Sequence, residues 1–124
     1  MYHEYARATF PAAEAIAANV AVTLCANGVK VCTASDIPVG FSDIPAFEAG
    51  SPISVRLINL AGTVEVKISG TVAKGDTLSP AAAGALKKAA AFPYCGIAME
   101  AGSDGDIITV MPFLQLAAAA AANA

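Results

Sequence analysis

The chain has 124 residues, a net charge of −3 and a pI near 4.9. Its length suits one domain of ordinary size. Charged residues make up 14%, well below the usual share of about 25%, which indicates a surface partly covered by a partner. The seven basic residues are scattered, which argues against nucleic-acid binding. There is no apolar run of membrane-spanning length and no apolar stretch before Phe10, so we expect a soluble, cytosol-made product that binds no membrane.

The first residues are predicted to form an extended N-terminal arm, residues 1–15. The arm carries three aromatic side chains, and Pro11 just beyond them disfavours regular strand pairing. Residues 12–18 are rich in alanine and could form a short helix, but a turn is the preferred interpretation. The aromatic residues are the candidate contacts with a partner: Tyr2, Tyr5 and Phe10.

The remainder predicts short antiparallel strands between Gly, Pro, Asn and Asp residues. Residues 20–25 and 29–33 are predicted to form a hairpin, with Asn27-Gly28 as its turn. Residues 53–58 and 63–69 alternate apolar and polar side chains, and Ala61-Gly62 is the expected turn between them.

A last strand is expected over residues 106–113, ended by Pro112. Residues 80–91 could form a helix by composition, but Gly84 and the lack of large apolar side chains favour a loop. The chain then ends in an Ala-rich tail, residues 117–124.

The chain also repeats itself. A shift of 56 residues places Ile16-Ala17 on Val72-Ala73 and Val39-Gly40-Phe41 on Cys95-Gly96-Ile97. A smaller offset places Glu48–Ser51 on the identical Glu100–Ser103. We therefore predict an all-β fold in which two similar units close into one small barrel or sandwich. The predicted β-domain spans 16–116, with the two units at about 16–60 and 72–113.

No catalytic, metal or cofactor site is expected. The only histidine, His3, lies in the first few residues, where a base cannot be rigidly held. The three cysteines show no metal-binding spacing and are interpreted as reduced, mostly buried thiols, although Cys25 and Cys32 flank a turn that a disulfide could span. Most carboxylates flank Gly, Pro or Ser, including Asp104-Gly105-Asp106, and are interpreted as turn residues.

The glycine turns of the second half resemble those of small tailed-phage head decoration (capsid cement) proteins. The similar segments are 70–76, 83–86, 95–102 and 106–110. The resemblance covers residues 53–113 well and the first half more loosely.

The resemblance implies a β-rich structural protein without catalysis or cofactor. It implies binding to the major capsid protein on the outer surface of the virion, commonly as a homotrimer, with a dimer as the other expectation. The arm could add a strand to an exposed edge of the coat protein. Two alternatives remain open: a small β-barrel binding module, expected to be monomeric with a concave pocket, and another minor virion part such as a fibre base.

Overall fold

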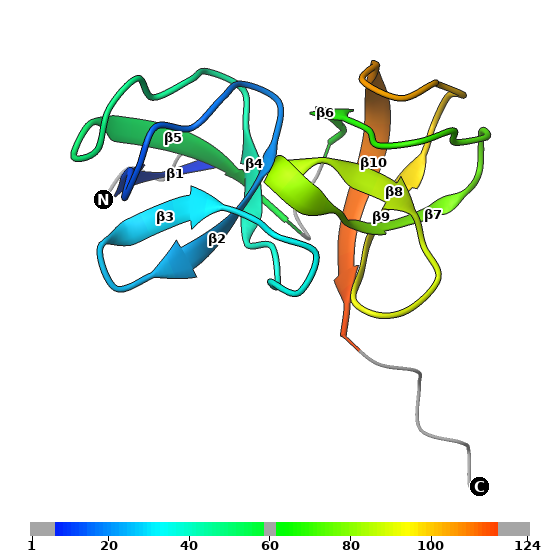
Figure 1. Ribbon diagram of the computed structural model, residues 1–124, viewed down its shortest axis with the longest axis horizontal. Helices are drawn as coiled ribbons and strands as arrows, with labels where there is room; N and C mark the ends of the chain where they lie inside the picture. Colours follow the sequence, from blue (N-terminus) through cyan, green and yellow to red (C-terminus); the bar gives the residue numbers. More distant parts are fainter. Residues whose placement is uncertain (1–6, 59–61, 117–124) are drawn as a thin grey trace, which may run out of the picture.

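The computed structural model describes residues 7–58 and 62–116. These residues form two five-stranded antiparallel sheets that lie side by side (Figure 1). The all-β class expected from the sequence is confirmed. In chain order the elements are β1 (Arg7–Pro11), β2 (Ala21–Cys25), β3 (Gly28–Val31), β4 (Gly40–Ser42), β5 (Pro52–Leu57), β6 (Val64–Lys67), β7 (Thr77–Pro80), the 3-10 turn η1 (Ala82–Gly84), β8 (Leu86–Lys88), β9 (Tyr94–Ala98) and β10 (Ile107–Gln115).

Strands β1 to β5 make up unit one, in the order β1-β5-β4-β2-β3. Its two outer strands approach each other at their ends. Ala12, just after β1, forms a parallel bridge with Val29 in β3. The amide of Ala13 donates to the carbonyl of Val29 at 2.8 Å. The sheet therefore curls toward a small barrel, which protects its edges.

Strands β6 to β10 make up unit two, in the equivalent order β6-β10-β9-β7-β8. Ile68 forms the matching parallel bridge with Leu86, and the amide of Ser69 donates to the Leu86 carbonyl at 2.7 Å. Ala12 and Ile68 are 56 residues apart. The two units share one topology, and the internal repeat seen in the sequence corresponds to this duplication.

The strands form where apolar side chains alternate. In β6, Val64 and Val66 are buried while the intervening Glu65 and the following Lys67 are exposed, as the sequence predicts. Strand β10 repeats the pattern over its first part with buried Ile108 and Val110. One face of each strand therefore packs inward.

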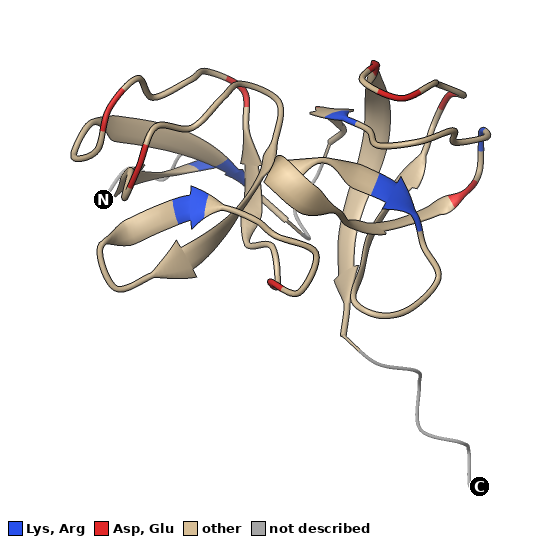
Figure 2. Cartoon of the chain, in the orientation of Figure 1, with Lys and Arg blue, Asp and Glu red and all other residues tan. Residues whose placement is uncertain are grey.

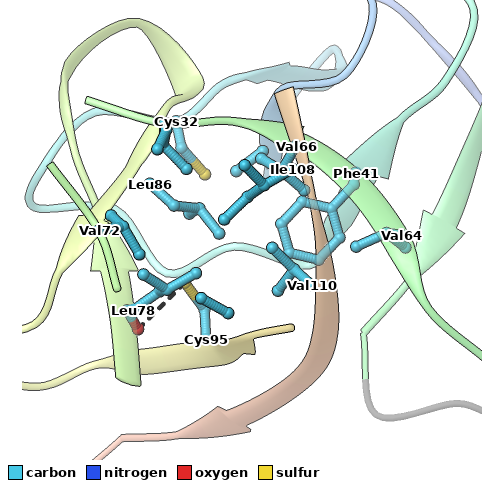
Figure 3. Packing of buried hydrophobic residues seen from close by; sticks show 13 residues of the cluster. Cys32, Phe41, Val64, Val66, Val72, Leu78, Leu86, Cys95, Ile108 and Val110 are labelled. Atoms are coloured by element: carbon cyan, nitrogen blue, oxygen red, sulfur yellow. Dashed lines mark hydrogen bonds between the residues drawn. The ribbon is translucent and has the colours of Figure 1, made fainter. Parts of the chain in front are cut away.

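The buried apolar side chains form two clusters, one mainly in each unit. The unit-one cluster is built around Ile16, Val22 and Val55. The larger cluster belongs mainly to unit two, but it also contains three residues of unit one: Ala21, Cys32 and Phe41. Figure 3 shows the Phe41 ring among side chains of β6 and β10. The larger cluster therefore extends across the junction and joins the two units.

Two boundaries differ from the sequence prediction at the start of each unit. Residues 7–11, placed in the N-terminal arm, form β1 and pair with β5 from Arg7↔Arg56 to Pro11↔Pro52. The expected units at about 16–60 and 72–113 likewise omitted β1 and β6. Pro11 is tolerated because it ends an outer strand, where no neighbouring strand requires the amide donor that proline lacks.

The turns between strands also differ in detail. In the first hairpin Ala26 and Asn27 form the turn, and Gly28 is already the first residue of β3, paired with Cys25. Gly28 has φ +126°, and a Cβ there would lie 1.9 Å from the Pro11 carbonyl oxygen. The glycine is therefore required by the close approach of β1, not by a tight Asn-Gly turn.

The segment around Ala61-Gly62 joins the two units and is not a hairpin turn. Strands β5 and β6, on either side of it, lie in different sheets. Ala61 lies outside the described residues, and Gly62 has φ +101°. The alternation of apolar and polar residues identifies a strand but not its pairing partner. The sequence therefore suggested a hairpin between two strands that are neighbours only along the chain.

Two predictions near the C-terminus are corrected. Pro112 does not end the last strand, because β10 continues to Gln115 past an irregularity in its pairing with β9. Pairing with β6 stops at Val110, so Pro112 needs no donor on that side. Residues 80–91 are not a plain loop, since they contain η1 and the short strand β8.

The structure also corrects the register of the repeat near the identical Glu-Ala-Gly-Ser segments. Ile16 bridges Ala46 as Val72 bridges Gly102, which makes Ala46 equivalent to Gly102. Glu48–Ser51 and Glu100–Ser103 therefore do not occupy equivalent positions.

Candidate interaction surface

The predicted aromatic contacts fall in two places. Tyr2 and Tyr5 lie outside the described residues, as does His3. Phe10 lies in β1, where its half-buried ring packs against the core of unit one. Phe10 therefore contributes to the fold, and its contact with a partner stays a prediction.

The cysteines are free thiols, and two of them are core residues. Cys32 and Cys95 are fully buried in the cluster that joins the units (Figure 3), and the Cys95 thiol donates to the Leu78 carbonyl at 3.6 Å. Burial raises the pKa of both thiols from 9.0 to about 12. Since the thiolate is the nucleophile, neither group is suited to covalent chemistry near neutral pH.

Thiol labelling at pH 8 should therefore distinguish the three cysteines. Cys25 is half-buried and is expected to react quickly with an aromatic disulfide reagent, whereas Cys32 and Cys95 should react only as the protein unfolds. Cys25→Ser should remove the fast phase and leave the slow one. Three fast-reacting thiols in the native protein would contradict the burial of the other two.

The carboxylates stabilise loops. Asp36, Asp76 and Asp106 each accept a hydrogen bond of 2.9 Å from the amide three residues earlier, a local geometry that holds turns. Asp104 accepts from the Gly70 amide and Glu100 from the Thr109 amide, both at 2.8 Å. Within residues 7–58 and 62–116, no three His, Cys, Asp or Glu side chains gather in a way that could hold a metal ion.

A small polar pocket lies where β1 and β4 of unit one face the start of unit two. Its volume is about 180 Å³. Arg7 forms an ion pair with Asp43 at its rim and also donates to the Ser54 hydroxyl at 3.5 Å. The pocket brings together side chains from both units: Arg7, Asn19, Phe41, Ser42, Asp43, Arg56, Thr63, Val64 and Glu65.

The Arg7–Asp43 pair predicts a modest loss of stability in acid. The hydrogen bond from Arg7, reinforced by its charge, lowers the pKa of the Asp43 carboxyl below 3.8. Because the folded pKa lies below the unfolded one, the stabilisation is fully present above pH 3.8 and is lost as the pH falls through the folded value. The two side chains are 31% and 39% exposed, so solvent screens the pair and we expect Asp43→Asn to cost less than about 1 kcal/mol at pH 7.

Urea denaturation of wild type and Asp43→Asn between pH 2 and 7 tests this. The difference in unfolding free energy should shrink toward zero at the acid end. A difference that stays constant with pH would show that the charge of Asp43 is not responsible.

An apolar groove lies between the β2 end of unit one and the C-terminal part of β10. Leu24 and Ile37 are more than half exposed there. From unit two, Leu114 lines the groove. The groove is formed by Thr23, Leu24, Ile37, Pro38, Val39, Ile58 and Leu114.

A second apolar surface is the loop between β4 and β5, residues 43–51, called here the 43–51 loop. Phe47 is 84% exposed and Ile44 is 64% exposed. The neighbouring 13–18 segment adds alanines beside Pro45 and Phe47. The sequence prediction missed this surface. The available signal was the pair of large apolar residues in a segment bounded by Asp43 and Glu48, where a solvated turn would carry polar residues.

The described residues thus define a class: two tandem five-stranded β-units with exposed apolar surfaces, and carboxylates and thiols used for the fold. No helix among them is long and apolar enough to cross a bilayer. No protein-family model matches the chain, and no curated protein sequence matches it.

Among solved structures, the fold is similar to the N base of the head fiber protein gp8.5 of bacteriophage phi29. The two share 18% sequence identity with a TM-score of 0.69, over 86% of this chain and 92% of that chain. At this identity the likeness establishes a common fold.

Proposed function

We propose that this chain is a structural protein of a tailed-phage virion, which binds the outer surface of the head and stabilises the shell. The observation that carries the proposal is the shared fold with the phi29 head fiber base across nearly the whole chain. The resemblance of the glycine turns in residues 53–113 to phage decoration proteins supports it independently. The partner in this proposal is the major capsid protein.

The chemistry of the described residues supports a binding role without catalysis. The buried thiols are protonated, the carboxylates hold turns, and two apolar surfaces are exposed. The proposal includes a homotrimer, or a dimer, on the capsid, because contacts repeated by symmetry give strong total attachment from weak individual ones. No cofactor, metal or nucleic acid forms part of it.

A fibre-base role is the second candidate, and the similarity to a head fiber base favours it. The two roles differ in their effect on the particle. A cement protein raises the temperature at which filled heads release DNA and is present in numbers comparable to its coat sites. A fibre base leaves that temperature unchanged.

The test is to add the purified chain to filled heads of the encoding phage that lack it. Co-sedimentation, the ratio of bound chain to coat protein, and the temperature of DNA release are measured together. Light scattering gives the mass of the free protein in units of the 12.3 kDa subunit. Failure of the wild-type chain to co-sediment with heads would contradict the proposal.

A further inference from the structure

The two units provide an internal comparison for every loop, because they repeat one backbone. The 43–51 loop of unit one corresponds to residues 99–106 of unit two. At one end, the Ser42 carbonyl accepts a hydrogen bond from the Asn19 amide at 2.8 Å. The Ala98 carbonyl accepts one from the Gly75 amide in the same way, also at 2.8 Å. A residue whose character differs between these loops is not required by the shared backbone.

The far ends of the two loops also match. The amide of Gly50 donates to the Ala12 carbonyl at 2.8 Å, as the amide of Gly105 donates to the Ile68 carbonyl at 2.9 Å. Both glycines have positive φ, +89° and +87°. The loops therefore leave and rejoin their barrels in the same way.

Between these anchors unit one carries one extra residue. Ala46 is equivalent to Gly102 through their bridges. The Glu48 carbonyl accepts from the Ser51 amide as the Ser103 carbonyl accepts from the Asp106 amide, so Glu48 is equivalent to Ser103. Phe47 falls between these pairs and has no counterpart. Its side chain is 84% exposed.

The other large apolar residue of the 43–51 loop is also specific to unit one. Ile44 corresponds to Glu100, since Ala46 and Gly102 set the register. The equivalent loop of unit two therefore has a glutamate in place of Ile44 and no residue in place of Phe47. Exposing two large apolar side chains that the fold does not need is typical of a contact surface.

Charge indicates what kind of surface covers this loop. Residues 12–19 and 43–51 carry Glu14, Asp43 and Glu48 and no lysine or arginine. Figure 2 shows both acidic and basic segments along the same edge of unit two, so the absence of basic residues is a feature of these two segments of unit one. Arg7 pairs with Asp43 and the Glu14 carboxylate accepts from the Val31 amide at 3.1 Å, so Glu48, next to Phe47 in the chain, supplies the negative charge there.

A second copy of the chain matches this surface poorly. Face-to-face contact would bring the same acidic residues together, which is repulsive. The apolar groove of another copy has no basic residue in its lining, and Asp36 adjoins Ile37 there. Charge complementarity therefore favours a different protein whose apolar pocket has a basic rim.

We propose that the 43–51 loop is the docking surface for the coat protein, with Phe47 and Ile44 entering an apolar pocket ringed by lysine or arginine side chains. This inference rests on the proposed function and names the surface that performs it. An exposed aromatic residue at the centre of a contact commonly dominates its affinity. The flanking acids steer association and make it sensitive to salt.

The experiment measures binding to filled heads lacking the protein for wild type, Phe47→Ser, Glu48→Lys and Leu24→Ser. Phe47→Ser should weaken binding at least about tenfold. Glu48→Lys should weaken it several-fold and reduce its salt dependence. Ile107→Ser, measured beside them, is the matched control, because Ile107 is 51% exposed but lies in β10, outside both apolar surfaces, and its binding should be unchanged. Leu24→Ser tests the apolar groove, and a loss of binding in Leu24→Ser that Phe47→Ser does not show would overturn the loop as the docking surface. Thermal unfolding confirms that each variant is folded.

The possible outcomes distinguish the docking surface, its partner and the proposed function. Wild-type binding that Phe47→Ser leaves intact would overturn the docking surface while the proposed function stands. Self-association of the free protein that is lost in both Phe47→Ser and Leu24→Ser would assign the loop to a second copy and overturn the coat partner. Absence of wild-type binding to heads would overturn the proposed function and this inference with it.

Discussion

Phe41→Ala is expected to lower the free energy of unfolding by about 3–5 kcal/mol. Phe41 is 1% exposed and lies in β4 of unit one, but it packs in the core cluster of unit two with Val64, Val66 and Val110. Removing the ring leaves a cavity at the junction of the two units, where backbone pairing within each sheet limits collapse. Urea denaturation followed by far-UV circular dichroism measures the change.

Phe47→Ala is the matched control for this prediction. It makes the same chemical change at a side chain that is 84% exposed, so its cost should stay within about 0.5 kcal/mol. Phe41→Leu should fall between the two. If Phe41→Ala cost no more than Phe47→Ala, Phe41 would not be the link between the cores that the structure shows.

The strands that the sequence predicted well are those with strict alternation and a glycine or proline nearby. Residues 53–58 and 63–69 contain most of β5 and all of β6, and the inward set of apolar residues is as expected. Alternation is a local property, and burying one face of a sheet makes it visible in the sequence. The fold class follows from such segments.

Strand pairing was harder to predict, because it is not local. Strand β1 pairs with β5, whose residues lie more than 40 positions later, and nothing in residues 7–11 identifies that partner. The same limit explains why Ala61-Gly62 was interpreted as a hairpin turn. A repeat of topology could still be inferred because glycine and apolar positions recur at a nearly constant spacing.

The candidate surface could be predicted only in its general nature. The low charge content predicted a surface partly covered by a partner, which stays a prediction, and the sequence directed attention to the N-terminal aromatic residues. Phe47 could not be recognised as an insertion until the register of the two units was known, since the identical Glu-Ala-Gly-Ser segments suggest a different alignment. The exposure of Phe47 is a property of the folded loop. The comparison of equivalent loops shows that the shared backbone does not require this residue.

Gly28→Ala is expected to destabilise the protein by about 3 kcal/mol or more. The added Cβ would lie 1.9 Å from the Pro11 carbonyl oxygen, and the φ of +126° is unfavourable for any L side chain. Relieving the clash requires β1 and β3 to separate, and this would break the bridge between Ala12 and Val29 that closes unit one. Thermal and urea unfolding should both show the loss.

Gly50→Ala separates the steric effect from the backbone effect. Gly50 also has positive φ, at +89°, but nothing lies within 4 Å of the position that an added Cβ would take. Its substitution should therefore cost only the strain of a left-handed residue, about 1–2 kcal/mol. The excess cost of Gly28→Ala over Gly50→Ala then measures the contact between β1 and β3. Equal costs would mean that the outer strands of unit one are not held together, so that its sheet is open in solution.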